Sequence, residues 1–505
     1  VSSSNEYFDS ADSFIKFDLA TTGSALRSLD EGGVHSLFRE IRLETQNGIL
    51  IEKWEKYNRL YAIISNLTHS KNHVDLVEHS AFDSIGKYPY NIQNGLSRDD
   101  NDAWNDLTGN AGSSQTASTT LTIDSGNAVE ELAAGDLIMF EVDNGGAIIG
   151  TYVKVVVSVT NATTVVLDSA FATNLTAGHI TKMTYKKVDT SSLILPMRHR
   201  AALNGGNCTM KLPLGFLNQK QWIPLKYIKQ GLKLVFQLEN PIYCLNQNLG
   251  VDQLSGQTAL SYTISNFKYV CSMFQLEQSL DEQVRNMYMT SGIKMPFISY
   301  KWQNRNVDGD SGSKNLQMNF GVKSARYVLA TLMAPRLIKD ADAAAQCNDS
   351  ISTFISGKLS KYQFKIGADE FPRHEVNIGS YAAEPFNHAL LTFGKHGSVI
   401  TDVRFEPHQW MPVNTIKSSA SGAATTPVSA TNESTKLIIS TRLDRDDNNF
   451  NGADLTVSPL DVSLEFSDSV SSALGSSASG RDLNVWLGYD AVVSLSANDG
   501  LLVRS

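Results

Sequence analysis

The chain has 505 residues, of which 42% are hydrophobic and 19% are charged. This composition excludes a disordered chain, which would be less hydrophobic, and a coiled coil, which would be more highly charged. With 43 Lys and Arg against 52 Asp and Glu, the net charge is −9, so the field of the whole chain repels nucleic-acid backbones. The length predicts a globular protein of about three folding units.

The cysteines lie far apart and form no Cys-x-x-Cys pair, which indicates neither a disulfide framework nor a zinc knuckle. They are Cys208, Cys244, Cys271 and Cys347. The sequence has no run of about 18 apolar residues and no signal-peptide pattern at its start. We therefore expect a soluble protein made in a reducing compartment. Because the chain begins with Val1, we also expect that an initiator methionine or a longer propeptide has been removed.

The first half of the chain, 1–275, is predicted to be rich in strands. Its strand segments are alternating or β-branched and bounded by Gly, Pro, Asn and Ser; they cover 14–19, 208–214, 222–228, 231–239 and 262–274. One helix is predicted at 55–67, where Tyr57, Leu60, Tyr61 and Ile64 share a face. We expect 222–239 to form a buried pair of strands, with one apolar face made of Leu232, Leu234, Phe236 and Leu238.

Residues 110–187 interrupt this half with a composition rich in Ser, Thr, Ala, Gly and Val and with several hairpin signals. We predict that they form an independent small β-domain. Its expected core is Leu137, Met139, Val142, Ile148, Val153, Val155, Val157, Val165 and Leu167. Its charged residues, among them Asp136 and Lys154, are expected on a solvated surface.

A second helix, within 276–293, is predicted to connect the two halves. Ser279 is its expected N-cap, and Gly292 is its expected C-terminal stop. The following half, 294–505, again shows strand patterns, at 436–443, 461–466 and 483–495. The Ser-rich stretches 418–434 and 467–480 are expected to be exposed loops.

The segment 361–377 makes a specific prediction for the second half. Its alternating Tyr362, Phe364 and Ile366 are expected to be buried on one face of a strand. Gly367 is expected to allow a turn, and Pro372 is expected to prevent continuation of the strand ladder.

Few residues are spaced for catalysis or metal binding. His69, His73, Glu78 and His79 could surround a metal only if 69–73 were helical, and the local sequence favours a polar loop. Asp308 and Asp310 resemble the start of a calcium loop without its closing Glu, and the acidic stretch 443–455 lacks ligand spacing. The segments 197–200 and 371–377 each offer one His where a cupin needs two. No nucleophile elbow or Walker loop occurs. We predict that the protein is not an enzyme and has no catalytic, cofactor-binding or metal-binding residues and no cofactor.

Four strings spread over both halves resemble the double jelly-roll major capsid proteins of the adenovirus and tectivirus lineage, most closely those of polinton-like viruses and virophages. They are 32–63, 210–239, 362–377, and 452–466 with 484–495. The resemblance implies an all-β fold of two consecutive eight-stranded jelly rolls, 1–275 and 294–505, with short helices. It also implies a structural protein of a DNA virus whose homotrimers form pseudo-hexagonal capsomers that tile an icosahedral capsid.

The same resemblance implies the partners and the location. Neighbouring capsomers, penton proteins and minor capsid proteins would contact the trimer in the virion, after synthesis and assembly in the host cell. Direct sequence-specific nucleic-acid binding is not expected, and an internal membrane beneath the shell is left open. The insertion 110–187 matches none of the family strings; its position implies an outer tower, available for contact with the host surface.

An alternative from a different class is a glycan-binding or glycan-cleaving β-sandwich protein, acting as a spike or a secreted enzyme. Such a protein would have a concave site lined by exposed aromatic rings. The six Trp residues are spread over both halves, which favours core roles for them.

Overall fold

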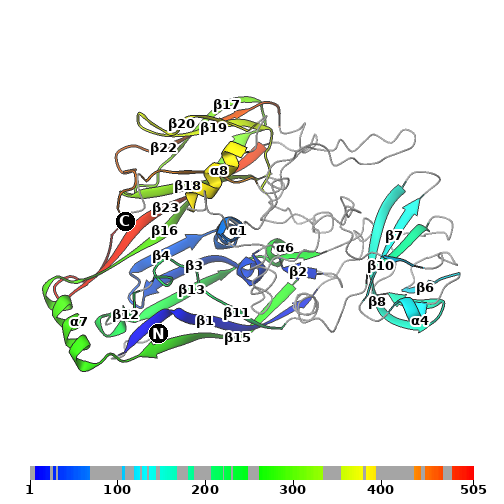
Figure 1. Cartoon of the computed structure of the whole chain (residues 1–505), viewed down its shortest axis with the longest axis horizontal. Helices are drawn as coiled ribbons and strands as arrows, with labels where there is room; N and C mark the ends of the chain where they lie inside the picture. The colour runs from blue at the N-terminus through cyan, green and yellow to red at the C-terminus, as the bar shows by residue number, and fades with distance from the viewer. Residues whose placement is uncertain are drawn as a thin grey trace.

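The computed structural model describes residues 6–22, 27–29, 32–68, 105–107, 119–124, 128–132, 136–143, 148–167, 180–186, 206–219, 221–228, 231–247, 261–333, 354–378, 383–393, 437–444, 450–469 and 480–504. Strands dominate these residues, which confirms the predicted all-β class. Figure 1 shows two groups of strands packed side by side and a smaller sheet at one end of the long axis. We call them the first unit (6–68 and 206–274), the second unit (293–504) and the insert sheet (105–186).

The first unit contains two antiparallel sheets that enclose an apolar core. In one sheet, β1 (Tyr7–Thr22) pairs with β15 (Ser261–Phe274) on one side and with β11 (Gly206–Met210) and β12 (Ile223–Pro224) on the other. The other sheet has the order β13 (Leu232–Leu238), β3 (Phe38–Thr45), β4 (Leu50–Glu55). The remaining elements are β2 (Arg27–Leu29), β14 (Leu245–Gln247), α1 (Tyr57–Thr68), α6 (Pro241–Cys244), η1 (Gly33–Leu37) and η3 (Leu225–Tyr227).

Part of the prediction for 222–239 is wrong. Within 222–228 only Ile223 and Pro224 form a strand, and the chain then turns into the 3-10 helix η3. β13 is a strand as predicted, but of its predicted apolar face Leu232 is buried and Leu238 is 50% exposed. β12 and β13 also pair with different sheets rather than with each other. The two prolines and the short apolar spacing suit a turn as well as a strand, so alternation alone could not distinguish them.

The second unit is an eight-stranded jelly roll. Numbered one to eight in chain order, its strands are arranged 1-8-3-6 in one sheet and 2-7-4-5 in the other, and all pairings are antiparallel. The strands are β16 (Ile293–Asp308), β17 (Gly312–Met318), β18 (Ala325–Met333), β19 (Leu359–Ile366), β20 (Asp369–Asn377), β21 (Ile439–Arg442), β22 (Leu460–Phe466) and β23 (Gly480–Ser496). β24 (Gly500–Arg504) adds to β23, and α8 (Ala383–Thr392) packs beside β21.

The segment 361–377 forms the hairpin of β19 and β20. Tyr362, Phe364 and Ile366 are buried as predicted, and Gly367 turns the chain with a φ of 60°. The ladder is interrupted by a register shift opposite Pro372, but the strand continues to Asn377. The prediction that the pairing would end at this proline is therefore wrong. β20 lies at the edge of its sheet, where a missing N–H is tolerated.

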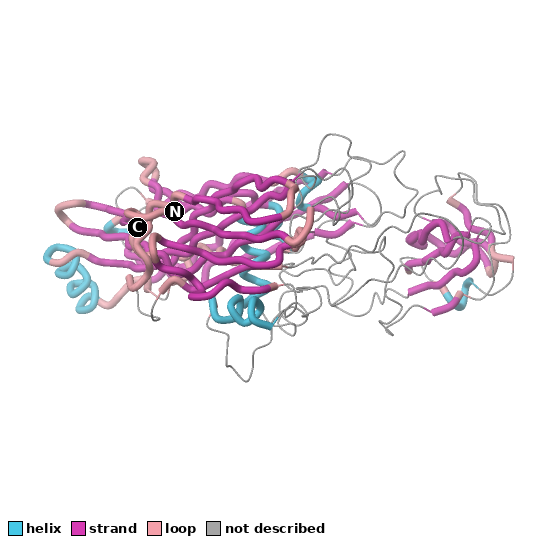
Figure 2. The backbone as a smooth tube through the Cα atoms, turned by 90° about the horizontal axis from the view of Figure 1, so that it is seen from above, coloured by secondary structure: helices cyan, strands magenta, loops and turns pink. Residues whose placement is uncertain are grey.

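The insert sheet has its own core, separate from that of the two units. Its strand order is β5 (Asn105–Asp106), β10 (Ile180–Lys186), β7 (Leu137–Asp143), β8 (Ile148–Asn161), β9 (Thr164–Leu167), β6 (Thr120–Thr122), and α4 (Ala128–Glu131) packs against it. Figure 2 shows it set apart from the strands of both units. Because β5 pairs with β10, the sheet begins before the predicted bound of residue 110.

The predicted core of the insert is correct for Val165 and Leu167 and wrong for Val157. Val165 and Leu167 are buried, whereas Val157 is 52% exposed and Val156 is buried instead. Asp136 and Lys154, expected at the surface, are also buried. The segments carrying β7 and β8 have apolar residues on both faces, so their alternation has no unique phase.

The two units share one continuous core. Buried residues of β3, β4 and α1 belong to the same cluster as those of β18 and β23. Every residue of β18 is buried, as are the first nine of β23. β18 and β23 belong to the sheet β16-β23-β18-β21. One face of that sheet packs on the other sheet of the jelly roll, where Arg481 lies over the ring of Phe466. The opposite face packs on the first unit.

Candidate assembly site: the seam, the connecting helix and the exposed faces

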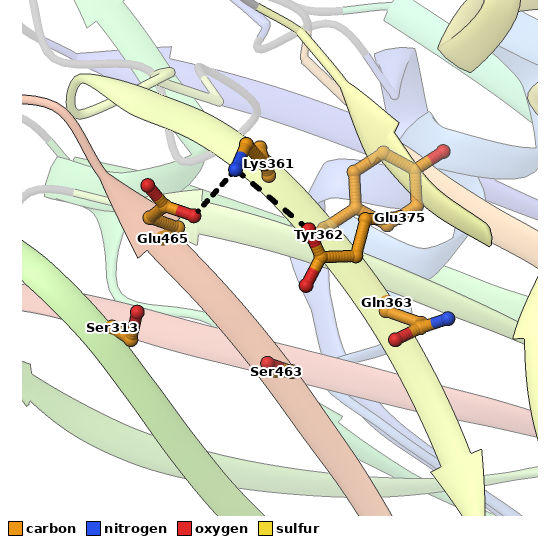
Figure 3. A pocket seen from close by; sticks show the side chains of 7 residues that line it. All are labelled: Ser313, Lys361, Tyr362, Gln363, Glu375, Ser463 and Glu465. Atoms are coloured by element: carbon orange, nitrogen blue, oxygen red, sulfur yellow. Dashed lines mark ion pairs between the residues drawn. The ribbon is translucent and has the colours of Figure 1, made fainter.

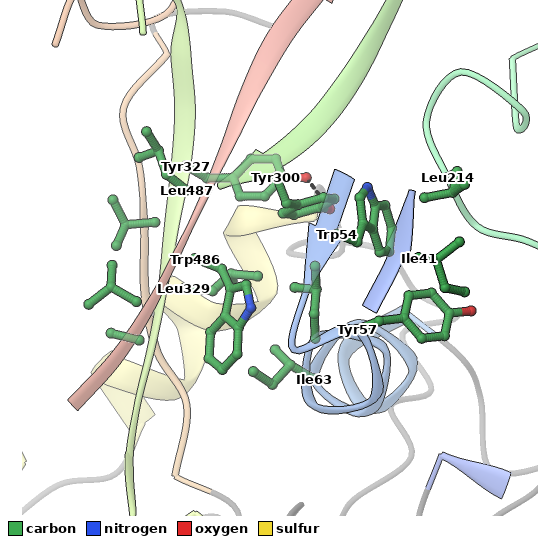
Figure 4. Packing of buried hydrophobic residues seen from close by; sticks show 14 of the residues in the cluster. Ile41, Trp54, Tyr57, Ile63, Leu214, Tyr300, Tyr327, Leu329, Trp486 and Leu487 are labelled. Carbon is green, nitrogen blue, oxygen red and sulfur yellow. Dashed lines mark hydrogen bonds between the residues drawn. The ribbon is translucent and has the colours of Figure 1, made fainter. Parts of the chain in front are cut away.

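We call the contact between the two units the seam. It joins β4, α1 and the loop 211–219 of the first unit to β16 and β23 of the second. Trp54 and Tyr300 meet edge to face with 4.8 Å between ring centroids, and the indole N–H of Trp486 donates to the carbonyl of Glu55 over 3.3 Å. Figure 4 shows Trp54 and Ile63 facing Tyr300 and Trp486. These large aromatic groups bury apolar surface between the two units.

Glu52 on β4 is a buried carboxylate at this seam, and it is 2% exposed. Its Oε1 accepts from Trp54 Nε1 (2.7 Å) and from the backbone N–H of Gly215 (2.9 Å), and its Oε2 accepts from the N–H of Phe216 (2.9 Å). Burial raises the pKa of Glu52 to about 7, although these donors act in the opposite direction. The side chain therefore ties β4 to the loop that lies against the second unit.

Gly215 places that loop directly on β16. A Cβ at this position would lie 1.8 Å from the carbonyl oxygen of Ile298, so only glycine fits. The neighbouring Phe216 packs edge to face on Phe297, with 5.6 Å between centroids. This explains physically why the string around 212–216 has a glycine between apolar residues.

A more polar part of the seam surrounds the start of α1. The ammonium of Lys56 lies 5.5 Å from the ring centroid of Trp302 on β16. Burial and, to a lesser extent, the charges of Arg59 and Arg39 lower the pKa of Lys56 to about 8. Charged groups are thus held close to the apolar centre of the seam, where they restrict the ways in which the units can dock.

The connecting helix α7 (Gln278–Thr290) has Glu277 as its N-cap, two positions before Ser279, so the predicted N-cap is wrong. Gly292 follows the end of the helix, as predicted, and has a left-handed conformation. None of the residues of α7 is buried. The helix is held to the first unit because Asp281 accepts from the hydroxyl of Tyr7 (2.7 Å) and pairs with Lys226. We call these three residues the latch.

Aromatic rings extend the latch on both sides. Tyr227 stacks on Tyr288 of α7 at 4.2 Å, and Phe274 contacts both Tyr7 and Trp222. Trp222 is 52% exposed, and Leu280, Met287 and Met289 on α7 are also exposed. This end of the molecule therefore presents apolar side chains to solvent.

Arg481 fixes the loops at one end of the jelly roll. Its guanidinium donates at 2.8–3.2 Å to four backbone carbonyls from three loops: those of Asp308, Asp310, Gly357 and Asp468. The side chain is fully buried. Asp308, considered above as a calcium ligand, pairs with Lys314, and this hydrogen bond lowers the pKa of the Asp308 carboxyl. Asp308 and Asp310 therefore belong to a tight turn.

No group of three metal-ligating side chains occurs among the described residues. The candidates His69, His73, Glu78 and His79 lie outside the described residues. The segments 418–434 and 197–200 also lie outside them, as does most of 467–480. His374, from the rejected cupin pattern, lies on the exposed edge strand β20 and contacts Glu384 of α8.

A shallow depression lies on the outer face of the jelly roll. It is lined by Ser313, Lys361, Tyr362, Gln363, Glu375, Ser463 and Glu465 and has a volume of about 30 Å³. Figure 3 shows Lys361 between Glu465 (3.0 Å) and Glu375 (3.7 Å). Pockets for small molecules begin at about 300 Å³ and are mostly apolar. This depression therefore has neither the size nor the lining of a sugar site.

The tryptophans do not form an aromatic platform in the described part of the chain. Trp54 and Trp486 are buried in the seam, Trp302 is half-buried, and Trp222 packs on Phe274. Trp104 and Trp410 lie outside the described residues. Cys208, Cys244 and Cys271 are free thiols. No helix in the described ranges is long and apolar enough to cross a membrane.

Sequence reasoning missed the residues that position the units. Glu52 lies in a strand that was not predicted, and a single Glu gives no signal of burial. Arg481 begins a long apolar strand, and its position there is the only signal that could have marked it. Buried charges are rare unless they are paired or hydrogen-bonded, but that environment is formed by distant segments.

Comparisons with known proteins give structural likeness only. No protein-family model matches the sequence, and no curated protein matches it. The chain is similar to a structure of the Sputnik virophage at 10% identity, with a TM-score of 0.46 over 99% of this chain and 83% of that one. It is similar to a capsid structure of PBCV-1 at 11% identity, with a TM-score of 0.44 over 100% and 92%. It is also similar to the mavirus major capsid protein at 9% identity, with a TM-score of 0.42 over 100% and 85%.

Proposed function

We propose that this chain is a major capsid protein whose homotrimers form the pseudo-hexagonal capsomers of an icosahedral virion shell. The observation that carries the proposal is the seam. A jelly roll and a second β-sandwich share one continuous core, so the chain is a rigid two-lobed body. Three such bodies around a threefold axis would present six lobes, which is the symmetry that hexagonal packing requires.

The division of labour along the chain is part of the proposal. Residues 1–275 would be the first jelly roll, 276–293 the connecting helix and 294–505 the second jelly roll. The insertion, predicted at 110–187 and beginning by Asn105, would be the outer tower. It lies at the opposite end of the long axis from α7 in Figure 1, which supports an orientation with α7 at the base.

The proposed partners follow from this orientation. The sides of the trimer would contact neighbouring capsomers, penton proteins and minor capsid proteins, and the tower would be available to the host surface. The apolar side chains exposed around α7 suit a protein partner at the base. The net charge of −9 argues against direct coating of the genome.

The oligomeric state tests the proposal. Native mass spectrometry of the purified chain at micromolar concentration is expected to give three times the monomer mass of 55.2 kDa. Negative-stain images of that species should show a six-lobed outline. A monomer with no larger species, or a trimer with three separate lobes, would contradict the proposal. Binding or cleavage of glycans by a monomer would favour the alternative class.

A further inference from the structure

We propose that the buried carboxyl of Glu52 at the seam binds a proton, and that the docking of the two units therefore depends on pH. This inference concerns the fold of the single chain and goes beyond the proposed function. The seam can respond to pH whether or not the chain assembles into capsomers.

The surroundings of Glu52 favour a bound proton. The groups that contact the carboxyl carry no positive charge: they are the indole of Trp54, the backbone N–H groups of Gly215 and Phe216, and the hydroxyl of Ser299 on β16, which can also accept a hydrogen bond from a protonated carboxyl. No Lys or Arg among the described residues forms an ion pair with it. A buried carboxylate without a cation loses its hydration and is stabilised by taking up a proton.

The other titratable groups that face Glu52 do not ionise near neutral pH. They are the phenols of Tyr300 on β16 and Tyr489 on β23, and burial raises the pKa of both above the ordinary value of 10. β4 and the loop 211–219 direct no second ionisable side chain at the carboxyl among the residues described. Glu52 is therefore the group at this point of the seam that can change charge between mild acid and neutral pH.

The direction of the pH effect follows from the raised pKa. The unfolded chain ionises Glu52 at about its ordinary value of 4.5, whereas the folded chain retains the proton up to about pH 7. Between these values unfolding releases a proton, so a rise in pH favours unfolding. The proton on Glu52 stabilises the folded chain fully below pH 4.5, and this stabilisation is lost above about pH 7. The seam is thus tighter in mild acid than at neutral pH.

The test compares the full chain with Glu52→Gln and with Glu55→Gln, a control on the same strand whose carboxylate is more exposed. Denaturant unfolding is measured from about pH 5 to pH 8. In the native protein, Glu52 is expected to raise the unfolding equilibrium constant by up to about tenfold per pH unit below pH 7, which corresponds to one released proton. Glu52→Gln should lose this part of the slope, and Glu55→Gln should retain it.

Infrared spectroscopy gives a second readout that does not depend on the stability of Glu52→Gln. The native protein and Glu55→Gln are expected to show the carbonyl band of one buried protonated carboxyl at pH 5.5, which disappears by pH 8. Equal slopes for the native protein and Glu52→Gln would overturn the proposal. So would the absence of that band at pH 5.5 in the native protein.

Discussion

Gly215 shows how a single missing side chain determines the distance between the two units. Its Cα lies so close to β16 that an added Cβ would be 1.8 Å from the carbonyl oxygen of Ile298. The Cβ is fixed to the backbone of residue 215 and the carbonyl belongs to the backbone of Ile298, so neither can rotate away. We predict that Gly215→Ala separates the loop from β16 and weakens the hydrogen bonds to Glu52. The expected cost is about 2–4 kcal/mol of unfolding free energy, measured by denaturant titration.

Gly32→Ala is a suitable control for this change. Its added Cβ would have its nearest contact at 3.3 Å, and the φ of −72° suits alanine. It is expected to cost clearly less than Gly215→Ala. If the two variants were equally stable, the close approach at the seam would not contribute to stability.

Single residues also show which side-chain environments can be predicted from sequence. The burial of Tyr362, Phe364 and Ile366 follows from their alternation in one strand, because period two marks one face. The burial of Glu52 could not be predicted in this way. Two of its donors, the backbone N–H groups of Gly215 and Phe216, come from residues more than 160 positions later in the chain, and a local pattern contains no information about them.

At the scale of elements, α7 is a helix whose position depends on few contacts. It has 13 residues and no buried side chain, and an isolated helix of that length is marginal in water. We predict that Asp281→Asn releases α7 from Tyr7 and Lys226. Hydrogen exchange of the helix amides should become faster, while the global unfolding free energy changes by less than about 1 kcal/mol.

Glu282→Gln is the matched control for the latch. Glu282 is the next residue on the helix and is exposed, and its carboxylate accepts a hydrogen bond from Gln278 within the helix. Exchange in this variant should resemble that of the native protein. Equal protection of α7 in native protein and Asp281→Asn would show that the stacked rings of Tyr227 and Tyr288 hold the helix without the latch.

Elements differ in how well the sequence predicts them. α1 was predicted because its apolar residues recur at helical spacing. α7 was predicted because a short segment ends at Gly292, which stops a helix. The strands of the insert were predicted as strands. In β8, however, Val157 was predicted to be buried and is exposed, and its neighbour Val156 is buried. Where residues on both faces are apolar, such as Val156 and Val157, only the partner sheet decides which face is buried.

At the scale of the whole molecule, the insert sheet and the two units have separate cores. We predict that replacing residues 105–186 with a short Gly/Ser linker leaves the unfolding free energy of the two units within about 1 kcal/mol of the native value. Calorimetry should show loss of one transition and retention of the main one. The main transition would shift strongly if the insert supported the seam.

The overall architecture could be predicted from the sequence only in part. The all-β class and the two strand-rich halves follow from periodicity, and the jelly roll of the second half agrees with the resemblance of its strings. The seam could not be predicted, because β23, whose first nine residues are all buried, contributes to it with the face that does not contact the other sheet of the jelly roll. A continuous apolar strand indicates double burial but does not identify what covers the second face.

The long-range strand pairing of both units also determines the order in which the chain can fold during synthesis. β1 is made early, but its partner β15 is completed only at Phe274, and β16 cannot pair with β23 until Ser496 has been made. Until then Trp54 and the rest of the first unit's half of the seam are exposed to solvent. Such late, long-range pairing slows folding and favours aggregation. We therefore expect ribosome-bound fragments that end before β23 to require chaperones, and the full chain to be released from them once that strand has paired.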